Sequence, residues 1–280
     1  MPWVRGADAD SLPAVERARL ADAWSAEAAR PDRILLVTCH RVELYGLGPA
    51  PAGAFDGEEH LLRVAAGLES AVIGEDEVLH QVRQALAGAR ANGPRDSRLT
   101  RLFETAIAGG RRARAGRTAT SAGLAEQAIA WLRQQTDLEG EPVIVGGAGR
   151  MGTALARAAT AAGARVTIAS RNHVRAATAA AAIGAQAADL VAGARAASKA
   201  AAVAVALAGP WEQLKEPLPP CADLSCPSAV PPAARRQYLG VDDLFKGGGE
   251  PPPGYVQAAT AIVAEKLAEY REWLEVRSIA

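Results

Sequence analysis

The sequence predicts an α/β protein: a small N-terminal α+β domain, a helical connector, a domain with a doubly wound parallel sheet, and one C-terminal helix. Three observations predict this fold. Strand and helix patterns mix before Gly48, helical spacing dominates from Glu58 to Trp131, and a strand-turn-helix unit begins at Glu141. We expect domain boundaries that give residues 1–135, 136–246 and 255–280.

Composition limits the class of protein. The 280 residues are 49% hydrophobic and 22% charged, enough for two modest cores. Lys+Arg and Asp+Glu each count 31, so no overall charge recruits nucleic acid. No apolar run approaches the ~20 residues of a membrane span, and no secretory signal opens the chain. The three cysteines lack zinc-like spacing to histidines, so we expect a soluble cytoplasmic protein without a metal site.

The N-terminal domain is expected to start with a strand and a helix. Pro13 lies in the first turn of that helix and Ser11 is its candidate cap. Pro31 and Asp32 break the helix after about Ala29. The predicted elements are a strand at 1–6, a helix at 13–29, strands at 33–37 and 42–47, and a loop at 48–53.

Cys39 lies between two apolar half-strands, in the segment Leu35–Tyr45. A cysteine in such a place is most often a small core residue. Here Thr38, His40 and Arg41 surround it with a hydroxyl, an imidazole and a fixed positive charge, and nearby cations favour the thiolate. Because reactive groups tend to lie where a strand ends, we interpret Cys39 as a nucleophile.

The helical connector carries a run of basic residues. Helices are predicted after Glu58, at 75–91, at 97–117 and at 122–135. The segment from Arg95 to Arg117 contains seven arginines and only two acidic residues. Such a run is either a solvated helix face or a surface that contacts phosphates, and both interpretations stay open.

A glycine motif gives the clearest domain signal. The residues Gly147, Ala148, Gly149, Arg150, Met151 and Gly152 follow the apolar strand Pro142–Val145, open a helix, and precede a second strand at 165–169. This G-x-G-x-x-G context is typical of a Rossmann-like dinucleotide-binding unit; a unit of the same fold without a ligand is the alternative. Gly147 would make the tight turn, Gly149 would admit a pyrophosphate, and Gly152 would let the helix pack closely.

The end of the second strand distinguishes two cofactors. An NAD site usually has an acidic residue there for the ribose hydroxyl, whereas Ser170, Arg171 and Asn172 stand here. Because arginine pairs bidentately with phosphate, we expect NADP. Further on, a helix at 176–190, strands at 202–208 and 221–224, a linker at 247–254 and a helix at 255–276 are predicted, with Cys221 and Cys226 incidental.

Four segments resemble the glutamyl-tRNA reductase family. Thr38–Tyr45 is similar to its first signature, with His40 where the family has Asn. His60–Glu75, followed by Gln81 and Val82, is similar to the second. Arg101–Phe103, together with Ala113 and Arg114, is similar to the third signature. Val241–Leu244 is similar to the fourth. The similarity runs in order along nearly the whole chain.

The resemblance implies NADPH-dependent reduction of glutamyl-tRNA to glutamate 1-semialdehyde, the first step toward 5-aminolevulinate and tetrapyrroles. Cys39 would attack the glutamyl carbonyl and release tRNA, and hydride from NADPH would reduce the thioester. His60 would be the general acid or base. The implied glutamyl-binding residues are Thr38, Arg41, Ser70, Glu75 and Gln81. Glutamate-1-semialdehyde aminomutase is an implied partner.

The sequence departs from the family in four places. Asp8–Ser11 replaces Asn-His-Lys-Thr, the segment between Tyr45 and His60 is short, and Ala204–Gly209 replaces polar residues after the fourth strand. The long C-terminal dimerisation domain is missing after Ala280, which predicts a monomer or a different dimer and a weaker grip on tRNA. Two alternatives therefore stay open: a paralogue acting on another acyl thioester, and a non-catalytic NADPH-binding regulator of tetrapyrrole synthesis.

Overall fold

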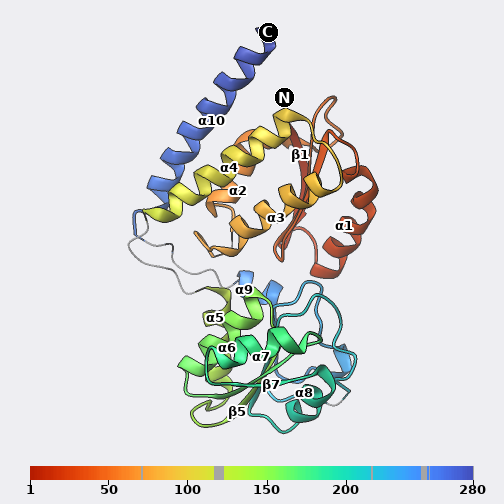
Figure 1. Cartoon of the computed structure of the whole chain (residues 1–280), viewed down its shortest axis with the longest axis vertical. Helices are drawn as coiled ribbons and strands as arrows, with labels where there is room; N and C mark the ends of the chain where they lie inside the picture. Colours follow the sequence, from red (N-terminus) through yellow and green to blue (C-terminus); the bar gives the residue numbers. More distant parts are fainter. Residues whose placement is uncertain (71, 117–122, 216, 247–250, 252, 280) are drawn as a thin grey trace. The chain divides into compact units, whose positions relative to one another are not determined.

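A computed structural model describes residues 1–70, 72–116, 123–215, 217–246, 251 and 253–279 (Figure 1). The chain forms two compact units. The first contains Met1–Ser121 and Gly248–Ala280, and the second contains Ala122–Gly247. The mixed α/β class predicted from the sequence is confirmed.

The first unit is built on a four-stranded antiparallel sheet with the order β2-β3-β1-β4. Its strands are β1 (Trp3–Asp8), β2 (Arg33–Val37), β3 (Arg41–Gly46) and β4 (Phe55–Asp56), and helix α1 (Ala14–Ala28) connects β1 to β2. Strands β2 and β3 form a hairpin in which Val37 lies opposite Val42. The turn of this hairpin is residues 38–40, so the fold places Cys39 between two paired strands.

Four helices complete the first unit: α2 (Gly57–Ala66), α3 (Glu77–Ala91), α4 (Ser97–Ala115) and α10 (Tyr255–Ile279). Leu61, Leu102 and Phe103 lie in their shared core, and the Tyr45 ring meets Phe103 edge to face. A Cβ atom on Gly110 would lie 2.4 Å from the Ala65 carbonyl oxygen, so only glycine lets α2 and α4 approach this closely.

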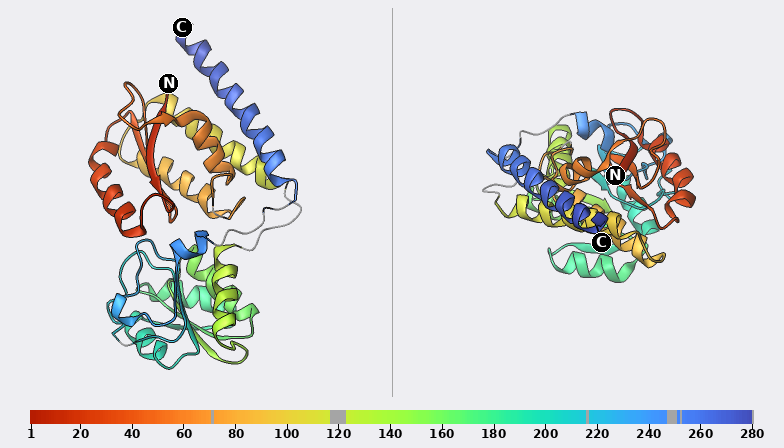
Figure 2. Two further views of the ribbon diagram at one scale, coloured as in Figure 1. Left: turned by 180° about the vertical axis from the view of Figure 1, so that it is seen from behind. Right: turned by 90° about the horizontal axis from the view of Figure 1, so that it is seen from above.

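Helix α10 belongs to the first unit although it is far away in the sequence (Figure 2). The Tyr255 hydroxyl donates to the Ala66 carbonyl at 2.6 Å, and the Tyr270 hydroxyl donates to the Arg98 carbonyl at 3.1 Å. Arg271 Nε lies 2.9 Å from the carboxylate of the buried Glu58. The sequence predicted 255–280 as a separate region, whereas in the structure Tyr255–Ile279 packs into the core of the first unit.

The second unit is a six-stranded parallel sheet with the order β10-β9-β8-β5-β6-β7. Counted within this unit, the order is 6-5-4-1-2-3, the doubly wound arrangement predicted from the glycine motif. The elements are β5 (Pro142–Gly146), α6 (Arg150–Ala161), β6 (Arg165–Ala169), α7 (His173–Ala181), β7 (Gln186–Ala188), α8 (Leu190–Ala197), β8 (Ala202–Val205), β9 (Cys221–Asp223), β10 (Tyr238–Gly240) and α9 (Val241–Lys246).

Two assignments differ from the sequence analysis. Residues 176–190 were predicted as one helix, but α7 ends at Ala181 and strand β7 follows at the sheet edge. Alanine favours helix, and only pairing with β6 makes this segment a strand. Helix α5 (Leu124–Gln135) was assigned to the connector, yet it packs on α6 and lies in the second unit. The predicted helix start at Ala122, the helix end at Arg117 and residues 247–250 and 252 of the linker lie outside the described residues.

Candidate functional site

The turn that carries Cys39 is shaped by Thr38. The Thr38 amide donates to the Arg41 carbonyl at 2.8 Å. Its side-chain oxygen accepts from the amides of His40 and Arg41 at 3.1 and 2.9 Å. Thr38 is buried and Cys39 is partly exposed at the turn. The hairpin therefore fixes the backbone of Cys39, and the Thr38 hydroxyl is engaged in the turn; binding of substrate by Thr38 stays a prediction.

Arg41 is buried beneath this turn. Its Nη1 donates to Glu43 Oε1 at 3.1 Å, and its Nη2 donates to the Glu69 carbonyl and lies 3.2 Å from His40 Nδ1. The guanidinium thus joins strand β3 to the segment after α2. Because it is held from three directions, its charge is fixed close to the Cys39 turn.

Glu43 is a functional candidate that the sequence analysis missed. It points from β3 into the interior, where its Oε1 lies 2.7 Å from His60 Nε2 and its Oε2 accepts from the Tyr45 hydroxyl at 2.7 Å. Burial tends to raise the pKa of Glu43, but the contacts with His60 and Arg41 outweigh it and hold the pKa below its ordinary value. A glutamate between apolar strand residues was the available signal, since a buried charge requires partners.

His40 and His60 have different environments. Burial and the Arg41 charge lower the pKa of His40, so this ring stays neutral near pH 7 and its Nδ1 can accept from Arg41. His60 lies near the start of α2, bonded to Glu43 and edge to face with the Phe55 ring at 5.0 Å between centroids. The structure therefore links His60 to Arg41 through one carboxylate.

The segment between α2 and α3 carries Ser70 and Glu75, both partly buried. Arg114 of α4 holds this segment: Nη1 donates to the Ala65 carbonyl at 2.7 Å, and Nε donates to the Glu75 carbonyl at 3.0 Å. Burial and the nearby Glu77 raise the pKa of the Glu75 carboxyl to about 7. Gln81 lies partly buried in the second turn of α3.

The predicted residues of the first unit are thus only partly linked by described contacts. Glu43 joins Arg41 to His60, the Thr38 hydroxyl accepts from the Arg41 amide, and Arg41 also contacts the residue before Ser70. The Arg41 charge acts on the Glu75 carboxyl. The roles assigned to all these residues, and the nucleophilic role of Cys39, stay predictions.

The basic run of the connector is largely engaged within the protein. Arg95 donates to the carbonyls of Ala89, Ala29 and Arg30. The others with described contacts are Arg98 on Asp96, Arg101 over the Trp273 ring, Arg112 on Glu265, and Arg114 as above. Arg111 is exposed, and Arg117 lies outside the described residues. The geometry favours a structural role for most of this run.

The glycine motif has the shape that a dinucleotide requires. Gly147 has φ +115°, and a Cβ atom there would lie 2.2 Å from the Ala206 carbonyl oxygen. A Cβ atom on Gly152 would lie 2.2 Å from the Gly147 carbonyl oxygen, so these two glycines pack the turn. A Cβ atom on Gly149 would meet nothing within 4 Å. The structure thus leaves space at Gly149, at the start of α6, where backbone amides attract anions.

The remaining predicted cofactor residues surround this turn. Arg150 is exposed, and Ala148 and Met151 are partly exposed. The Gly147 amide donates to the Ala169 carbonyl at 2.8 Å, which ties the turn to the end of β6. There the Ser170 hydroxyl accepts from the Asn172 amide at 3.2 Å, and the Asn172 side chain caps α7. Arg171 is exposed, so its guanidinium is accessible to a phosphate.

Polar groups missed by the sequence analysis support the end of β8. The Leu207 amide donates to Ser225 Oγ at 2.9 Å. The buried Asp223 accepts from the Ser225 amide at 2.9 Å and from the Ser228 hydroxyl at 2.7 Å. The apolar segment after β8 is therefore held by residues that follow β9, and only its backbone can offer polar contacts.

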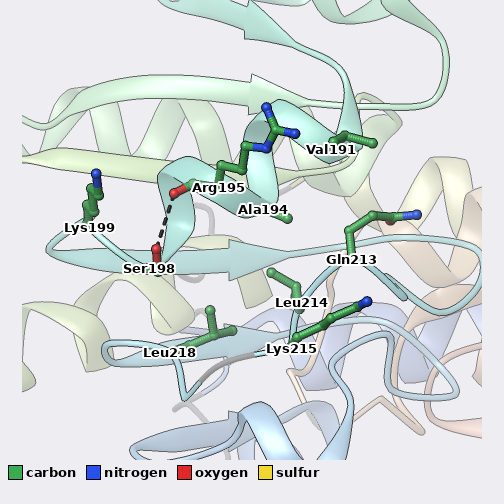
Figure 3. A pocket seen from close by; sticks show the side chains of 9 residues that line it. All are labelled: Val191, Ala194, Arg195, Ser198, Lys199, Gln213, Leu214, Lys215 and Leu218. Atoms are coloured by element: carbon green, nitrogen blue, oxygen red, sulfur yellow. Dashed lines mark hydrogen bonds between the residues drawn. The ribbon is translucent and has the colours of Figure 1, made fainter.

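A pocket of about 600 Å³ opens along α8 (Figure 3). Its lining combines apolar side chains such as Leu214 and Leu218 with Arg195, Lys199 and Lys215. None of its lining residues was predicted to act in a site.

In the described part of the chain, no helix is both long enough and apolar enough to cross a membrane.

Comparison with known families gives two partial matches. The model "Glutamyl-tRNAGlu reductase, N-terminal domain" matches residues 55–117, and "NADP oxidoreductase coenzyme F420-dependent" matches residues 143–225. The first covers helices α2 to α4. The second covers the glycine motif and the strands from β5 to β9.

Curated relatives agree with the first match, and a solved structure shares the fold. The chain is 42% identical over 142 residues to glutamyl-tRNA reductase of Thermus thermophilus, covering 42% of this chain and 36% of the relative. It is 37% identical over 199 residues to that of Halobacterium salinarum, covering 61% and 45%. The chain thus spans less than half the length of these relatives. The glutamyl-tRNA reductase of Methanopyrus kandleri has the same fold, with TM-score 0.50, 23% identity, and coverage of 98% of this chain and 80% of that one. The chain is therefore similar to the glutamyl-tRNA reductases in its first unit and in part of its length.

Proposed function

We propose that this protein reduces glutamyl-tRNA to glutamate 1-semialdehyde with NADPH, through a thioester on Cys39. The observation that carries the proposal is the Cys39 turn: it presents a partly exposed cysteine two residues before the buried Arg41, which pairs with Glu43 and, through Glu43, with His60. A thiol held beside a fixed cation is suited to nucleophilic attack on an ester.

In the first step, Cys39 Sγ attacks the glutamyl carbonyl carbon, and the bond from that carbon to the tRNA ribose oxygen breaks. The leaving oxygen needs a proton. Because the ionised Glu43 accepts from His60 Nε2, the other ring nitrogen, Nδ1, can take the proton that the Cys39 thiol loses and then give it to the leaving oxygen. His60 is therefore the group we assign to proton transfer, with Glu43 as its partner.

The glutamyl group carries a carboxylate and an ammonium. Arg41 offers the positive charge near Cys39, and Glu75 offers a carboxyl group whose pKa of about 7 would fall beside an ammonium. Ser70 and Gln81 supply neutral hydrogen-bonding groups, and Thr38 keeps the turn in shape. We assign these five residues to substrate binding on the strength of the family signatures together with these contacts.

The second unit is the site we assign to NADPH. The open space at Gly149 and the amides that begin α6 suit the pyrophosphate, and the exposed Arg171 suits the 2′-phosphate. NADPH bound there supplies the hydride that reduces the thioester to the aldehyde. The partner we expect is the aminomutase that consumes this aldehyde.

A single-turnover assay tests the reaction. Purified protein, glutamyl-tRNA and NADPH are mixed, and free tRNA and semialdehyde are followed together. We expect semialdehyde from the wild type and none from Cys39→Ser, which lacks the thiol but should still bind NADPH. Cys226→Ser is the control, because Cys226 lies in the second unit. Semialdehyde formed at the wild-type rate by Cys39→Ser would reject the thioester. Turnover of a small acyl thioester but not of glutamyl-tRNA would favour the paralogue.

The choice of cofactor has its own test. Arg171→Ala should weaken NADPH binding about 10- to 100-fold, since a hydrogen bond between charged groups contributes roughly 1.5–3 kcal/mol. NADH binding should change little, because NADH lacks the phosphate. Arg175→Ala is the matched control, an exposed arginine four residues further on. Titration by intrinsic fluorescence measures both affinities, and an equal loss for the two cofactors would contradict the phosphate contact.

A further inference from the structure

We propose that Arg17 is a positioning residue for Cys39: it fixes the backbone of the Cys39 turn and stabilises the thiolate. This inference rests on the proposed nucleophilic role of Cys39 and extends it to a residue on a different element. Arg17 is in the first turn of α1, 22 positions away from Cys39 in the sequence.

The contacts of Arg17 connect two segments. Its Nη2 donates to the carbonyl oxygen of Cys39 itself at 2.6 Å, and its Nη1 donates to the Leu12 carbonyl at 2.6 Å. The residue is only 2% exposed. One guanidinium therefore ties the nucleophile's own peptide group to the loop that precedes α1.

Burial of the Arg17 guanidinium costs free energy unless its hydrogen bonds compensate for the lost hydration. A guanidinium taken out of water loses its hydration, which only well-formed hydrogen bonds replace. Helix α1 packs on both β2 and β3, the two strands of the Cys39 hairpin. The charge of Arg17 is thus held by the packing of the unit, and it cannot turn away to solvent.

Besides holding the backbone of the Cys39 turn, Arg17 places a positive charge next to it. Arg17 and Arg41 both disfavour a proton on His40, whereas Asp8 and Asp10 favour one. The charged groups acting on this turn are therefore Arg17 from α1, Asp8 at the end of β1, Asp10 in the following loop, and Arg41 from β3. A cation beside the Cys39 peptide favours the thiolate over the thiol, and its effect is opposite in sign to that of Asp8 and Asp10.

Alkylation of Cys39 by iodoacetamide measures this effect without tRNA or NADPH. The rate is followed from pH 5 to pH 10, with modification at Cys39 quantified by mass spectrometry. In Arg17→Gln, which removes the charge but keeps a donor, the midpoint of the profile should rise and the rate near pH 7 should fall about tenfold, one pKa unit. In Arg17→Lys, which keeps the charge, the midpoint should stay near that of the wild type.

Measuring kcat distinguishes the effect of the Arg17 charge from its effect on the position of the Cys39 backbone. In Arg17→Lys, kcat should fall at least about tenfold, because an ammonium cannot hold both carbonyls in the planar geometry of a guanidinium. Arg19→Gln, at an exposed arginine on the same helix, is the control for both readings. Circular dichroism and thermal melting verify that each variant is folded.

The outcomes are distinct. Folded Arg17→Gln with a wild-type alkylation profile overturns the proposal, as does folded Arg17→Lys with wild-type kcat. If Arg17→Gln does not fold, the Lys variant decides by its kcat. A raised midpoint in a protein whose wild type makes no semialdehyde would leave the Arg17 assignment standing and reject the proposed substrate instead.

Discussion

The residues around Cys39 are held by buried charged groups, each of which depends on the others for its hydrogen-bond partners. Glu43 receives hydrogen bonds from Arg41 and Tyr45 and pairs with His60, and Arg41 also donates to the Glu69 carbonyl. Removing one member of a buried group like this typically costs 3–5 kcal/mol, because a charge is left unpaired. Substitutions here therefore change stability and chemistry at once, so thiol reactivity and folding have to be measured in the same variant.

Glu75 gives a pH-dependent prediction at this scale. Its pKa is about 7 in the folded protein, against an ordinary value of 4.5. As pH rises from 4.5 to 7, the unfolded chain releases this proton while the folded chain keeps it, so the folded state loses stability. Glu75→Gln should remove that loss and gain roughly 1–3 kcal/mol over the wild type by pH 7, after allowance for partial exposure.

Urea unfolding at pH 5, 6, 7 and 8 measures the difference for Glu75. Glu104→Gln, at an exposed glutamate of α4, should run parallel to the wild type at every pH. A constant gap between Glu75→Gln and the wild type across this range would show that the proton is not released where we expect.

At the scale of elements, the segment between α2 and α3 depends on a helix outside it. Gly67 and Gly74 adopt φ of +74° and +80°, and the Gly74 amide donates to the Gly67 carbonyl at 3.0 Å, so this turn closes on itself. Arg114 then fastens it to α4. The position of Ser70 is thus set by a local turn and one distant arginine.

Arg114→Lys tests this arrangement. The guanidinium donates to the carbonyls of Ala65, Gly110 and Glu75, and an ammonium cannot reach all three at once. We expect a loss of roughly 1–3 kcal/mol in the free energy of unfolding, from buried acceptors left unpaired. Hydrogen exchange of residues 67–70 and 72–76 should become faster.

The control for Arg114 lies on the same helix. Arg111→Lys changes an exposed arginine, and its exchange pattern should match the wild type. Unchanged exchange of residues 67–70 and 72–76 in Arg114→Lys would mean that the hydrogen bond between Gly67 and Gly74 holds the segment without Arg114.

At the scale of the molecule, the first unit is assembled from both ends of the chain. Tyr270 shows how: its ring is buried, its hydroxyl donates to the Arg98 carbonyl, and Trp273 stacks on it at 6.3 Å. Tyr270→Ala should destabilise the first unit by about 3–5 kcal/mol, the usual cost of truncating a large buried ring. Glu272→Ala, on the exposed face of α10, should have little effect.

Calorimetry with and without NADPH measures this change. NADPH should raise the melting temperature of the second unit in both proteins, since a ligand stabilises the part that binds it. The unfolding transition whose melting temperature NADPH does not change is the one that belongs to the first unit. Equal melting of that transition in Tyr270→Ala and the wild type would contradict the role of α10 in this core.

The sequence predicted what short-range patterns encode. The apolar half-strands around Cys39, the G-x-G-x-x-G turn after β5 and the helices of the connector follow from spacing and from residue preference, which act over a few positions. Strand β7 was missed for the same reason, because its alanines favour a helix until β6 pairs with them. Family signatures added residue roles, which stay proposals.

Only the tertiary structure decided which distant groups meet. It brought Arg17 to the Cys39 carbonyl, Arg114 to Glu75, and α10 to the core of the first unit. The sequence shows that a glutamate stands among apolar residues at position 43, and from this one concludes that it needs partners. It does not show that the partners are Arg41, Tyr45 and His60. The physical reason is that burial fixes the need for a partner, whereas the packing of elements far apart in the chain fixes which one is within reach.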